Sequence, residues 1–171
     1  MAAEVWDLYN KDRTLVGKTH VRGEILPDEC YHMVVHVWIK NRDGKYLISQ
    51  RSADRPSNPL KWECVGGSVI AGENTLQAAI RETHEEIGVR LCAECGKIVH
   101  TITRGVVNGK KFNDILDVWL FEYNGEVDLK DATTAEVADV HWMSREEIQA
   151  IYEAGNLVPT LEYFFTHVYG V

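Results

Sequence analysis

The chain is predicted to have an α+β fold in which a mixed β-sheet is flanked by helices. Three observations lead to this class: strand-like runs occur on both sides of residues 75–87, those residues have a helical period, and two more helical patterns follow the last strand. This order is typical of a sheet with helices on its faces. At 171 residues, 45% of them hydrophobic, the chain is predicted to form a single domain, 1–171, with an N-terminal β-hairpin extension at about 1–26.

Strands are predicted to make up most of the first 65 residues. Runs rich in β-branched, aromatic and apolar residues predict a hairpin at 5–17, an edge segment at 20–26 and strands at 33–39, 46–51 and 61–65. The hairpin turns at Asn10, Lys11 and Asp12, and the turn from Asn41 to Gly44 joins the next two strands. The polar loop 52–60 precedes the last strand, which leads into a glycine-rich loop.

Residues 75–87 carry a clear helical signal. Their mainly apolar stripe consists of Leu76, Ile80, Thr83 and Ile87. Asn74 is a suitable N-cap, with Gln77 three residues later to complete a capping box. Gly88 is placed to end the helix in a left-handed conformation. The helix is therefore predicted to turn one face toward a core and a polar face away from it.

After this helix the pattern returns to strands and then ends in helices. Strands are predicted at 97–104, 114–123 and 137–143, and helices at 145–153 and 159–168. A turn at Asn108-Gly109 is expected between the first two strands. Ser144 and Glu147 form the capping-box signature of the first helix, which Gly155 closes.

The glycine-rich loop and the polar face of the helix at 75–87 together suggest a site. The loop contains Gly66, Gly67 and Gly72, which permit positive φ and a close approach to a ligand. Glu82, Glu85 and Glu86 project onto one patch of the helix, where their like charges repel. Because Mg²⁺ prefers oxygen ligands, a bound cation would turn this repulsion into attraction. The alternative is a solvated acidic helix face.

The spacing of these residues resembles the Nudix box of the Nudix hydrolases. From Gly67 the chain has five residues, Glu73, seven residues, Arg81-Glu82, two residues, Glu85-Glu86, one residue and Gly88-Val89. The one departure is Thr83, where the family usually has an aliphatic residue. So many fixed positions are far more specific than a lone glycine motif. The resemblance implies a curved mixed β-sheet sandwiched between α-helices, and an enzyme that cleaves nucleoside diphosphates linked to another moiety.

The family pattern also implies the metal ligands. They would be the side chains of Glu82, Glu85 and Glu86, together with the backbone carbonyl of Gly66. The implied cation is Mg²⁺, with Mn²⁺ as a possible substitute. Such a cation would neutralise diphosphate oxygens and position the attacking nucleophile.

The remaining box residues and one residue outside the box are predicted to assist. Arg81 would orient the glutamates, and Glu73 and Gly67 would support the loop and helix. Glu136 lies just before a strand, in a segment that often contributes a metal-binding or basic carboxylate in Nudix proteins. Its alternative is a solvated loop acid. The predicted catalytic residues are therefore Glu85, Glu86, Glu136 and Arg81, and the identity of the general base among the glutamates stays open.

A related enzyme class offers a second interpretation. The opening region, with His32, resembles isopentenyl-diphosphate isomerases, which share this fold and have a metal-binding histidine there. Their catalytic cysteine would fall at Gly66 and a further histidine ligand at Ser68, and glycine cannot protonate a double bond. Cys64 lies two residues too early. Hydrolysis is therefore preferred, with His32 and His36 as partly buried strand residues. A third interpretation is a non-catalytic nucleotide-binding module.

The substrate itself is not encoded in a motif. Arg51 and Arg104 are candidate substrate-binding residues, because they lie on elements that could face a cleft and pair with phosphates. Arg55 and Lys61 share this property. The alternative for each of them is an ordinary surface charge. A small-molecule nucleotide or organic diphosphate is the expected partner.

Charge and composition narrow the other partners. A formal net charge of −8 argues against binding to a nucleic-acid backbone. The chain shows no secretory signal and no stretch of 18 apolar residues, so no membrane is expected and a cytoplasmic location is predicted. Four cysteines fit a reducing compartment, and Cys92 and Cys95 form a single CxxC without a second pair. The N-terminal hairpin is a candidate interface for a homodimer.

Overall fold

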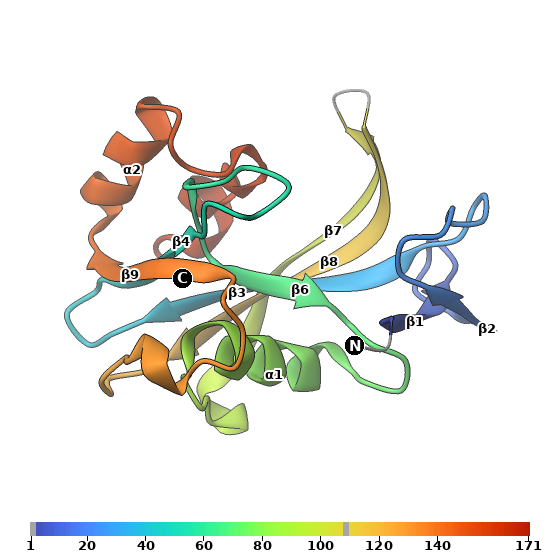
Figure 1. Cartoon of the computed structure of the whole chain (residues 1–171), viewed down its shortest axis with the longest axis horizontal. Helices are drawn as coiled ribbons and strands as arrows, with labels where there is room; N and C mark the ends of the chain where they lie inside the picture. Colours follow the sequence, from blue (N-terminus) through green and yellow to red (C-terminus); the bar gives the residue numbers. More distant parts are fainter. Residues whose placement is uncertain (1–2, 108–109) are drawn as a thin grey trace.

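The fold is known from a computed structural model, which describes residues 3–107 and 110–171. A mixed β-sheet lies between two helical layers (Figure 1). Helix α1 (Thr75–Ile87) covers one face, and α2 (Arg145–Glu153) with the C-terminal segment covers the other. The predicted α+β class, with a mixed sheet between helices, is therefore confirmed.

The described strands of this sheet come from residues 32–143 of the chain. They are β3 (His32–Lys40), β4 (Tyr46–Arg51), β5 (Trp62–Glu63), β6 (Val65–Ser68), β7 (Gly96–Val107), β8 (Lys110–Glu122) and β9 (Val137–Met143). Their order is β5-β4-β3-β8-β7, with β6 also beside β3 and β9 also beside β4. Strands β3 and β8 run parallel, and the other pairs are antiparallel. The predicted turn at Asn108-Gly109 lies outside the described residues.

Strand β3 shows how one sequence builds a core on each side of the sheet. Successive residues of a strand point to opposite faces. Val35 and Val37 are fully buried in the core beneath α1, whereas Trp38 is fully buried in the core beneath α2 and the C-terminal segment. Burial of apolar surface in both cores stabilises the layered arrangement.

Helix α1 forms as its capping signals predict. The Asn74 side chain accepts a hydrogen bond from the Gln77 amide at 2.9 Å, and the Gln77 side chain accepts one from the Asn74 amide at 2.9 Å. Gly88 ends the helix with a φ of 74°. Thr83 is fully buried, and its hydroxyl donates to the Ala79 carbonyl at 2.7 Å. The apolar stripe therefore tolerates this threonine.

The C-terminal segment differs from the single helix predicted at 159–168. It forms a 3₁₀ turn, η3 (Pro159–Leu161), followed by a π-helical turn, η4 (Phe164–Val168). In the π turn the Tyr169 amide bonds to the Phe164 carbonyl at 2.9 Å. Phe164 is fully buried and stacks on Trp38 with ring centroids 4.4 Å apart. The segment that packs these rings on the sheet therefore consists of two irregular turns and not of one α-helix.

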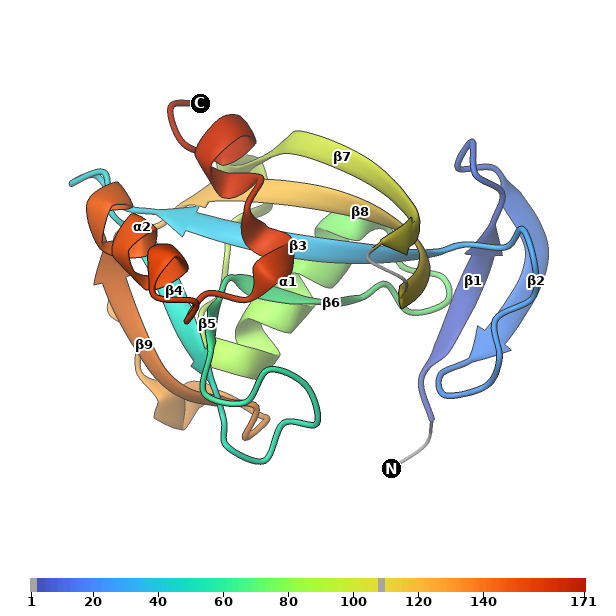
Figure 2. The ribbon, with the colours of Figure 1, turned by 90° about the horizontal axis from the view of Figure 1, so that it is seen from above.

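The N-terminal hairpin stands at one end of the main sheet (Figure 2). Its strands β1 (Val5–Tyr9) and β2 (Leu15–Val21) form a separate two-stranded sheet. The predicted edge segment at 20–26 is strand only as far as Val21, after which the chain turns. The hairpin touches the loop before α1, because Gly72 donates its amide proton to an Asp7 carboxylate oxygen at 2.8 Å.

None of the helices in the described ranges has the length and apolar character needed to cross a membrane.

Candidate active site

The sequence predicted that Gly66 and Gly67 lie in a glycine-rich loop. This prediction was wrong, because both residues lie in strand β6. Their backbones pair with His36 and Val35 of β3, which supplies partners for backbone groups that a buried loop would leave unpaired. Only Gly72, farther along the chain, has the predicted positive φ, at 85°. The requirement for glycine at the other two positions is therefore one of space.

Strand β6 packs directly against the acidic side of α1. A Cβ at Gly67 would lie 2.1 Å from an oxygen of Glu82. A Cβ at Gly66 would lie 2.7 Å from the Val35 carbonyl oxygen. Both distances are far inside van der Waals contact. Gly67 therefore lets the strand approach the Glu82 carboxylate closely, and Gly66 lets it fit against β3.

Arg81 holds the acidic patch together. Its guanidinium bonds to Glu73 twice, at 2.9 and 3.0 Å. One nitrogen, Nη1, donates to both Glu82 at 2.9 Å and Glu85 at 3.1 Å. Another, Nη2, donates to the Ser68 carbonyl at 2.9 Å and so ties the helix to the end of β6. The contacts expected of Arg81 and Glu73 are present, and their catalytic roles stay predictions.

Glu86 differs from its neighbours because its carboxylate is buried without a partner. The residue is only 7% exposed, and within the described chain no hydrogen bond or ion pair reaches its side chain. Burial raises its pKa well above the ordinary value, and the charges of Glu82, Glu63 and Glu136 raise it further, while Arg55 opposes them. A buried carboxylate among other carboxylates is costly unless a cation joins them.

The acidic residues fit a divalent cation in chemistry and charge. Burial raises the pKa of Glu82 to about 7 despite the opposing charge of Arg81. Among the residues that the structure describes, no three acidic, histidine or cysteine side chains already form a cage for an ion. Glu82 and Glu85 are instead turned toward Arg81. Oxygen donors with a surplus of negative charge are the ligands Mg²⁺ prefers.

Glu136 approaches the same end of α1. The amides of Thr133 and Thr134 bond to the Glu85 carbonyl at 2.9 and 3.0 Å, which fastens the preceding loop to the helix. The Glu136 carboxylate then pairs with Arg55 at 2.7 Å. The structure therefore brings Glu136 near the box residues, and its role as base or ligand stays a prediction.

Glu63 belongs to this cluster although the sequence interpretation did not include it. It lies on β5 and forms a short ion pair with Arg51. Burial raises the pKa of Glu63, although Arg51 lowers it. In the sequence, the one signal that could have indicated Glu63 was its charge, which is unusual inside a short strand that leads into the glycine-rich segment. Arg51, a candidate substrate residue, is thus occupied by a carboxylate.

Arg104 lies on a different face of the sheet. Its guanidinium forms two hydrogen bonds of 2.7 Å with Asp114 on the neighbouring strand. It also lies over the ring of Phe112, with 4.8 Å from its central carbon to the ring centroid. Arg51 and Arg104 are therefore not brought together, and neither guanidinium is unpaired.

The residues compared with the isomerase site have structural partners. His32 stacks on Trp6 with ring centroids 4.1 Å apart. Nδ1 of His36 lies 2.6 Å from the Tyr163 hydroxyl, and burial lowers the pKa of His36 to about 3. Cys64 is buried in the core beneath α2 and the C-terminal segment. Both histidines are half-buried strand residues, as predicted.

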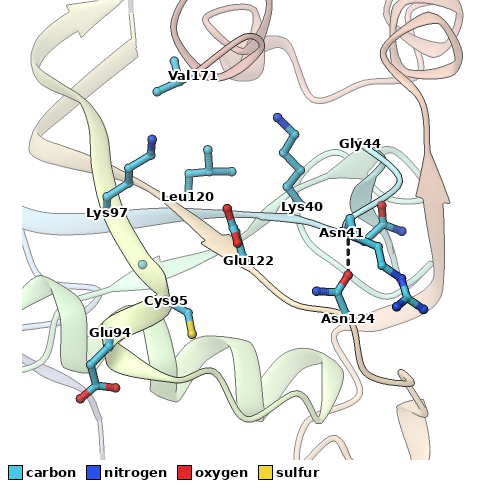
Figure 3. Close-up of a pocket in the computed structure, with 12 residues that line it drawn as sticks. Lys40, Asn41, Gly44, Glu94, Cys95, Lys97, Leu120, Glu122, Asn124 and Val171 are labelled. Atoms are coloured by element: carbon cyan, nitrogen blue, oxygen red, sulfur yellow. Dashed lines mark hydrogen bonds between the residues drawn. The ribbon is translucent and has the colours of Figure 1, made fainter.

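A cavity of about 650 Å³ lies away from this acidic cluster (Figure 3). Its lining includes Lys40, Arg42 and Lys97, and the side chains of Lys40 and Lys97 point toward the chain end at Val171. None of the predicted site residues lines it. The cavity is therefore separate from the acidic cluster at α1.

Comparisons with known proteins identify relatives that cover most of this chain. A family model described as the NUDIX domain matches residues 31–165. An uncharacterized Nudix hydrolase of Listeria monocytogenes is 37% identical over 167 residues, which cover 95% of this chain and 90% of that relative. An isopentenyl-diphosphate Delta-isomerase of Streptomyces avermitilis is 30% identical over 96 residues, 54% of this chain and 48% of that relative.

The fold has relatives among solved structures as well. The crystal structure of a Deinococcus radiodurans protein superposes with a TM-score of 0.70 and 21% sequence identity, covering 91% of this chain and 92% of that one. The family model and the Listeria relative show that the chain belongs to the Nudix family. With hydrolases of that family as its relatives over most of its length, it is an enzyme of the Nudix hydrolase class.

Proposed function

We propose that this enzyme is a Mg²⁺-dependent hydrolase that cleaves the diphosphate linkage of a nucleoside diphosphate joined to another moiety, or of a related organic pyrophosphate. The observation that carries the proposal is the buried and unpartnered carboxylate of Glu86 among other carboxylates in the described chain. A cation at this place would relieve their repulsion and attract a diphosphate.

The chain has suitable groups to hold the cation. Glu82, Glu85 and Glu86 would bind it, with the backbone carbonyl of Gly66 as a further oxygen donor. When bound, Mg²⁺ neutralises phosphate charge and favours ionisation of water. Mn²⁺ would serve similarly, because it also accepts oxygen ligands.

The other residues have supporting roles in this proposal. Arg81 keeps Glu82 and Glu85 on one side of the helix through shared hydrogen bonds. Proton transfer from the attacking water requires a carboxylate within hydrogen-bond reach. Glu85, Glu86 and Glu136 are the candidates, and Glu136 is held near the helix end by Arg55 and the loop before it.

A substrate panel with and without Mg²⁺ tests the proposal. It contains nucleoside diphosphate sugars, ADP-ribose, dinucleotides and isopentenyl diphosphate, with EDTA as the metal-free condition. We expect hydrolysis of at least one nucleoside derivative that stops with EDTA. Glu85→Gln and Glu86→Gln are each expected to lower kcat by about 100-fold or more. Glu126→Gln, at an exposed site in the segment after β8, is the control for loss of one charge.

Two results would favour a different function for this enzyme fold. Turnover of isopentenyl diphosphate alone, by isomerisation, would favour the isomerase interpretation that the Streptomyces relative suggests, against the evidence of Gly66 and Ser68. Binding without turnover of any compound would favour a non-catalytic nucleotide-binding module. Equal activity of the glutamine variants and the native protein would contradict the metal assignment.

A further inference from the structure

Two arginines beside the acidic cluster are each tied to a glutamate. Arg51 forms a short ion pair with Glu63, and their side chains are only 11% and 21% exposed. Arg55 pairs with Glu136 at 2.7 Å. These are the groups best suited to bind phosphate oxygens near α1, because guanidinium matches such oxygens in geometry and charge. In this structure carboxylates already occupy both of them.

The strand arrangement brings these pairs together. Strand β4 lies between β5 and β9, with Ser49 opposite Glu63 and Arg51 opposite Val137. The next amide, that of Ser52, bonds to the Glu136 carbonyl at 2.8 Å. Glu63 and Glu136 therefore reach the end of β4 from its two sides.

Glu86 lies on α1, on the side of the sheet that Glu63 faces, because Val65, two residues after Glu63, is buried in the core beneath α1. It is 7% exposed and has no partner in the described chain, and the charges of Glu63 and Glu136 both act on it. Glu63 thus contacts the Arg51 guanidinium, and its charge also acts on the unpartnered carboxylate of Glu86. A cation that satisfies Glu86 would compete with Arg51 for Glu63.

We propose that Glu63 is a positioning residue with two alternative partners. While no cation is bound, Glu63 pairs with Arg51. When a cation is present at Glu86, Glu63 turns to the cation, and Arg51 becomes free to contact the diphosphate. This inference rests on the proposed function. It gives Arg51 the predicted substrate contact only after metal binding, and it assigns a role to Glu63 that the box does not include.

The exchange couples two binding events. A divalent cation carries twice the charge of a guanidinium, so it is a strong competitor for a carboxylate in a partly buried site. If the cation releases Arg51, it raises the affinity for diphosphate, and by linkage diphosphate raises the affinity for the cation by the same factor. Without the cation, the pair with Glu63 keeps Arg51 from binding anions.

Binding measurements test the exchange without depending on turnover. Mn²⁺ binding is followed by its electron paramagnetic resonance signal, and binding of α,β-methylene-ADP, which has a non-hydrolysable diphosphate, is followed by calorimetry in EDTA. For Glu63→Gln we expect Mn²⁺ affinity to fall about 10-fold or more, as for other residues that support metal ligands. In EDTA the same variant is expected to bind α,β-methylene-ADP several-fold more tightly than the native protein, because Arg51 is free.

The double variant Arg51→Gln/Glu63→Gln separates release of Arg51 from simple loss of a negative charge. We expect the gain in metal-free affinity for α,β-methylene-ADP to disappear in it. Arg51→Gln alone is expected to bind Mn²⁺ more tightly, because Glu63 has no other partner, and it supplies a second test if Glu63→Gln does not fold. Glu126→Gln, exposed in the segment after β8, controls for net charge.

Either of two results would overturn the inference. One is unchanged Mn²⁺ affinity in Glu63→Gln, and the other is a gain in analogue binding that persists in the double variant. These outcomes differ from failure of the proposed function, in which the native protein hydrolyses no compound of the panel whatever the behaviour of Glu63.

Discussion

Three glutamates of one helix carry the same side chain in different environments. Glu85 is the most accessible of them, with a side chain 36% exposed. Glu82 is 13% exposed and shares Arg81 with it, while Glu86 is buried without a partner in the described chain. The residue type alone indicates a metal site, whereas burial and partners decide how readily each carboxylate ionises.

The raised pKa of Glu82 predicts a pH-dependent effect on stability. The pKa of Glu82 is about 7 in the folded state, against an ordinary value of 4.5. The neutral form of Glu82 therefore contributes its full stabilisation below about pH 4.5, and this contribution is lost as pH rises through 7. Glu82→Gln cannot ionise. In EDTA, its free energy of unfolding minus that of the native protein is therefore expected to be larger at pH 8 than at pH 5, by up to about 3 kcal/mol.

Urea unfolding at the two pH values measures this difference. Glu126→Gln, with an exposed side chain, is expected to show no such change. A difference between Glu82→Gln and the native protein that is the same at both pH values would contradict the prediction. At pH 8, saturating Mg²⁺ is expected to stabilise the native protein more than Glu82→Gln, since the variant lacks one ligand.

At the scale of elements, α1 is held at both ends by different means. Its start depends on local capping by Asn74 and Gln77. Its end depends also on packing, because a Cβ at Gly88 would lie 2.6 Å from the Cβ of Asp131 in the 3₁₀ turn η2 (Leu129–Asp131). Gly88 thus permits both the left-handed turn and the close approach of η2. The helix end carries Glu85 and Glu86, so its position matters for the site.

Gly88→Ala and Gly155→Ala form a matched pair that separates these two effects. Both glycines have a similar positive φ, 74° and 71°, but a Cβ at Gly155 would meet nothing within 4 Å. We expect Gly155→Ala to lower the free energy of unfolding by about 1 kcal/mol through strain alone. Gly88→Ala is expected to cost about 1–3 kcal/mol more, because η2 must move. Equal losses in urea unfolding would show that η2 does not press on the helix end.

At the scale of the whole molecule, the N-terminal hairpin is clamped onto the Nudix fold. Arg13 makes two hydrogen bonds of 2.7 Å with Asp117, whose side chain is fully buried in β8. These bonds help to hold the pKa of Asp117 below its ordinary value although burial opposes them. The family match begins at residue 31, after the hairpin. The hairpin therefore lies outside the matched range and contacts the loop before α1.

Removal of Arg13 is expected to loosen the hairpin. Arg13→Gln leaves the Asp117 carboxylate with only its other hydrogen bonds, and we expect a loss of about 2 kcal/mol in the free energy of unfolding. Hydrogen exchange should then become faster at the Ala71 and Gly72 amides, which bond to the hairpin. Arg22→Gln, which breaks a mostly exposed pair with Glu4, is the control. Unchanged exchange in Arg13→Gln would contradict the clamp.

Local signals account for what was predicted well. Both caps of α1, the N-cap of α2 and the limits of β9 match the structure, because capping boxes and short periodic runs depend on neighbouring residues. The errors occur where distant segments meet. Gly66 and Gly67 became strand by pairing with β3, and the C-terminal segment became irregular as Phe164 packed on Trp38.

The sequence by itself determined the family, the helix that carries the acidic patch and the residues that could bind a cation. The patch was predictable because helical spacing places Glu82, Glu85 and Glu86 on one side of the helix whatever surrounds them. Only the tertiary structure decided that Glu86 is buried without a partner in the described chain and that Glu63 joins the cluster while holding Arg51. The physical reason is that burial and ion pairing depend on β4 lying between β5 and β9. Strand β9 is far from β4 along the chain, and no local pattern specifies their pairing.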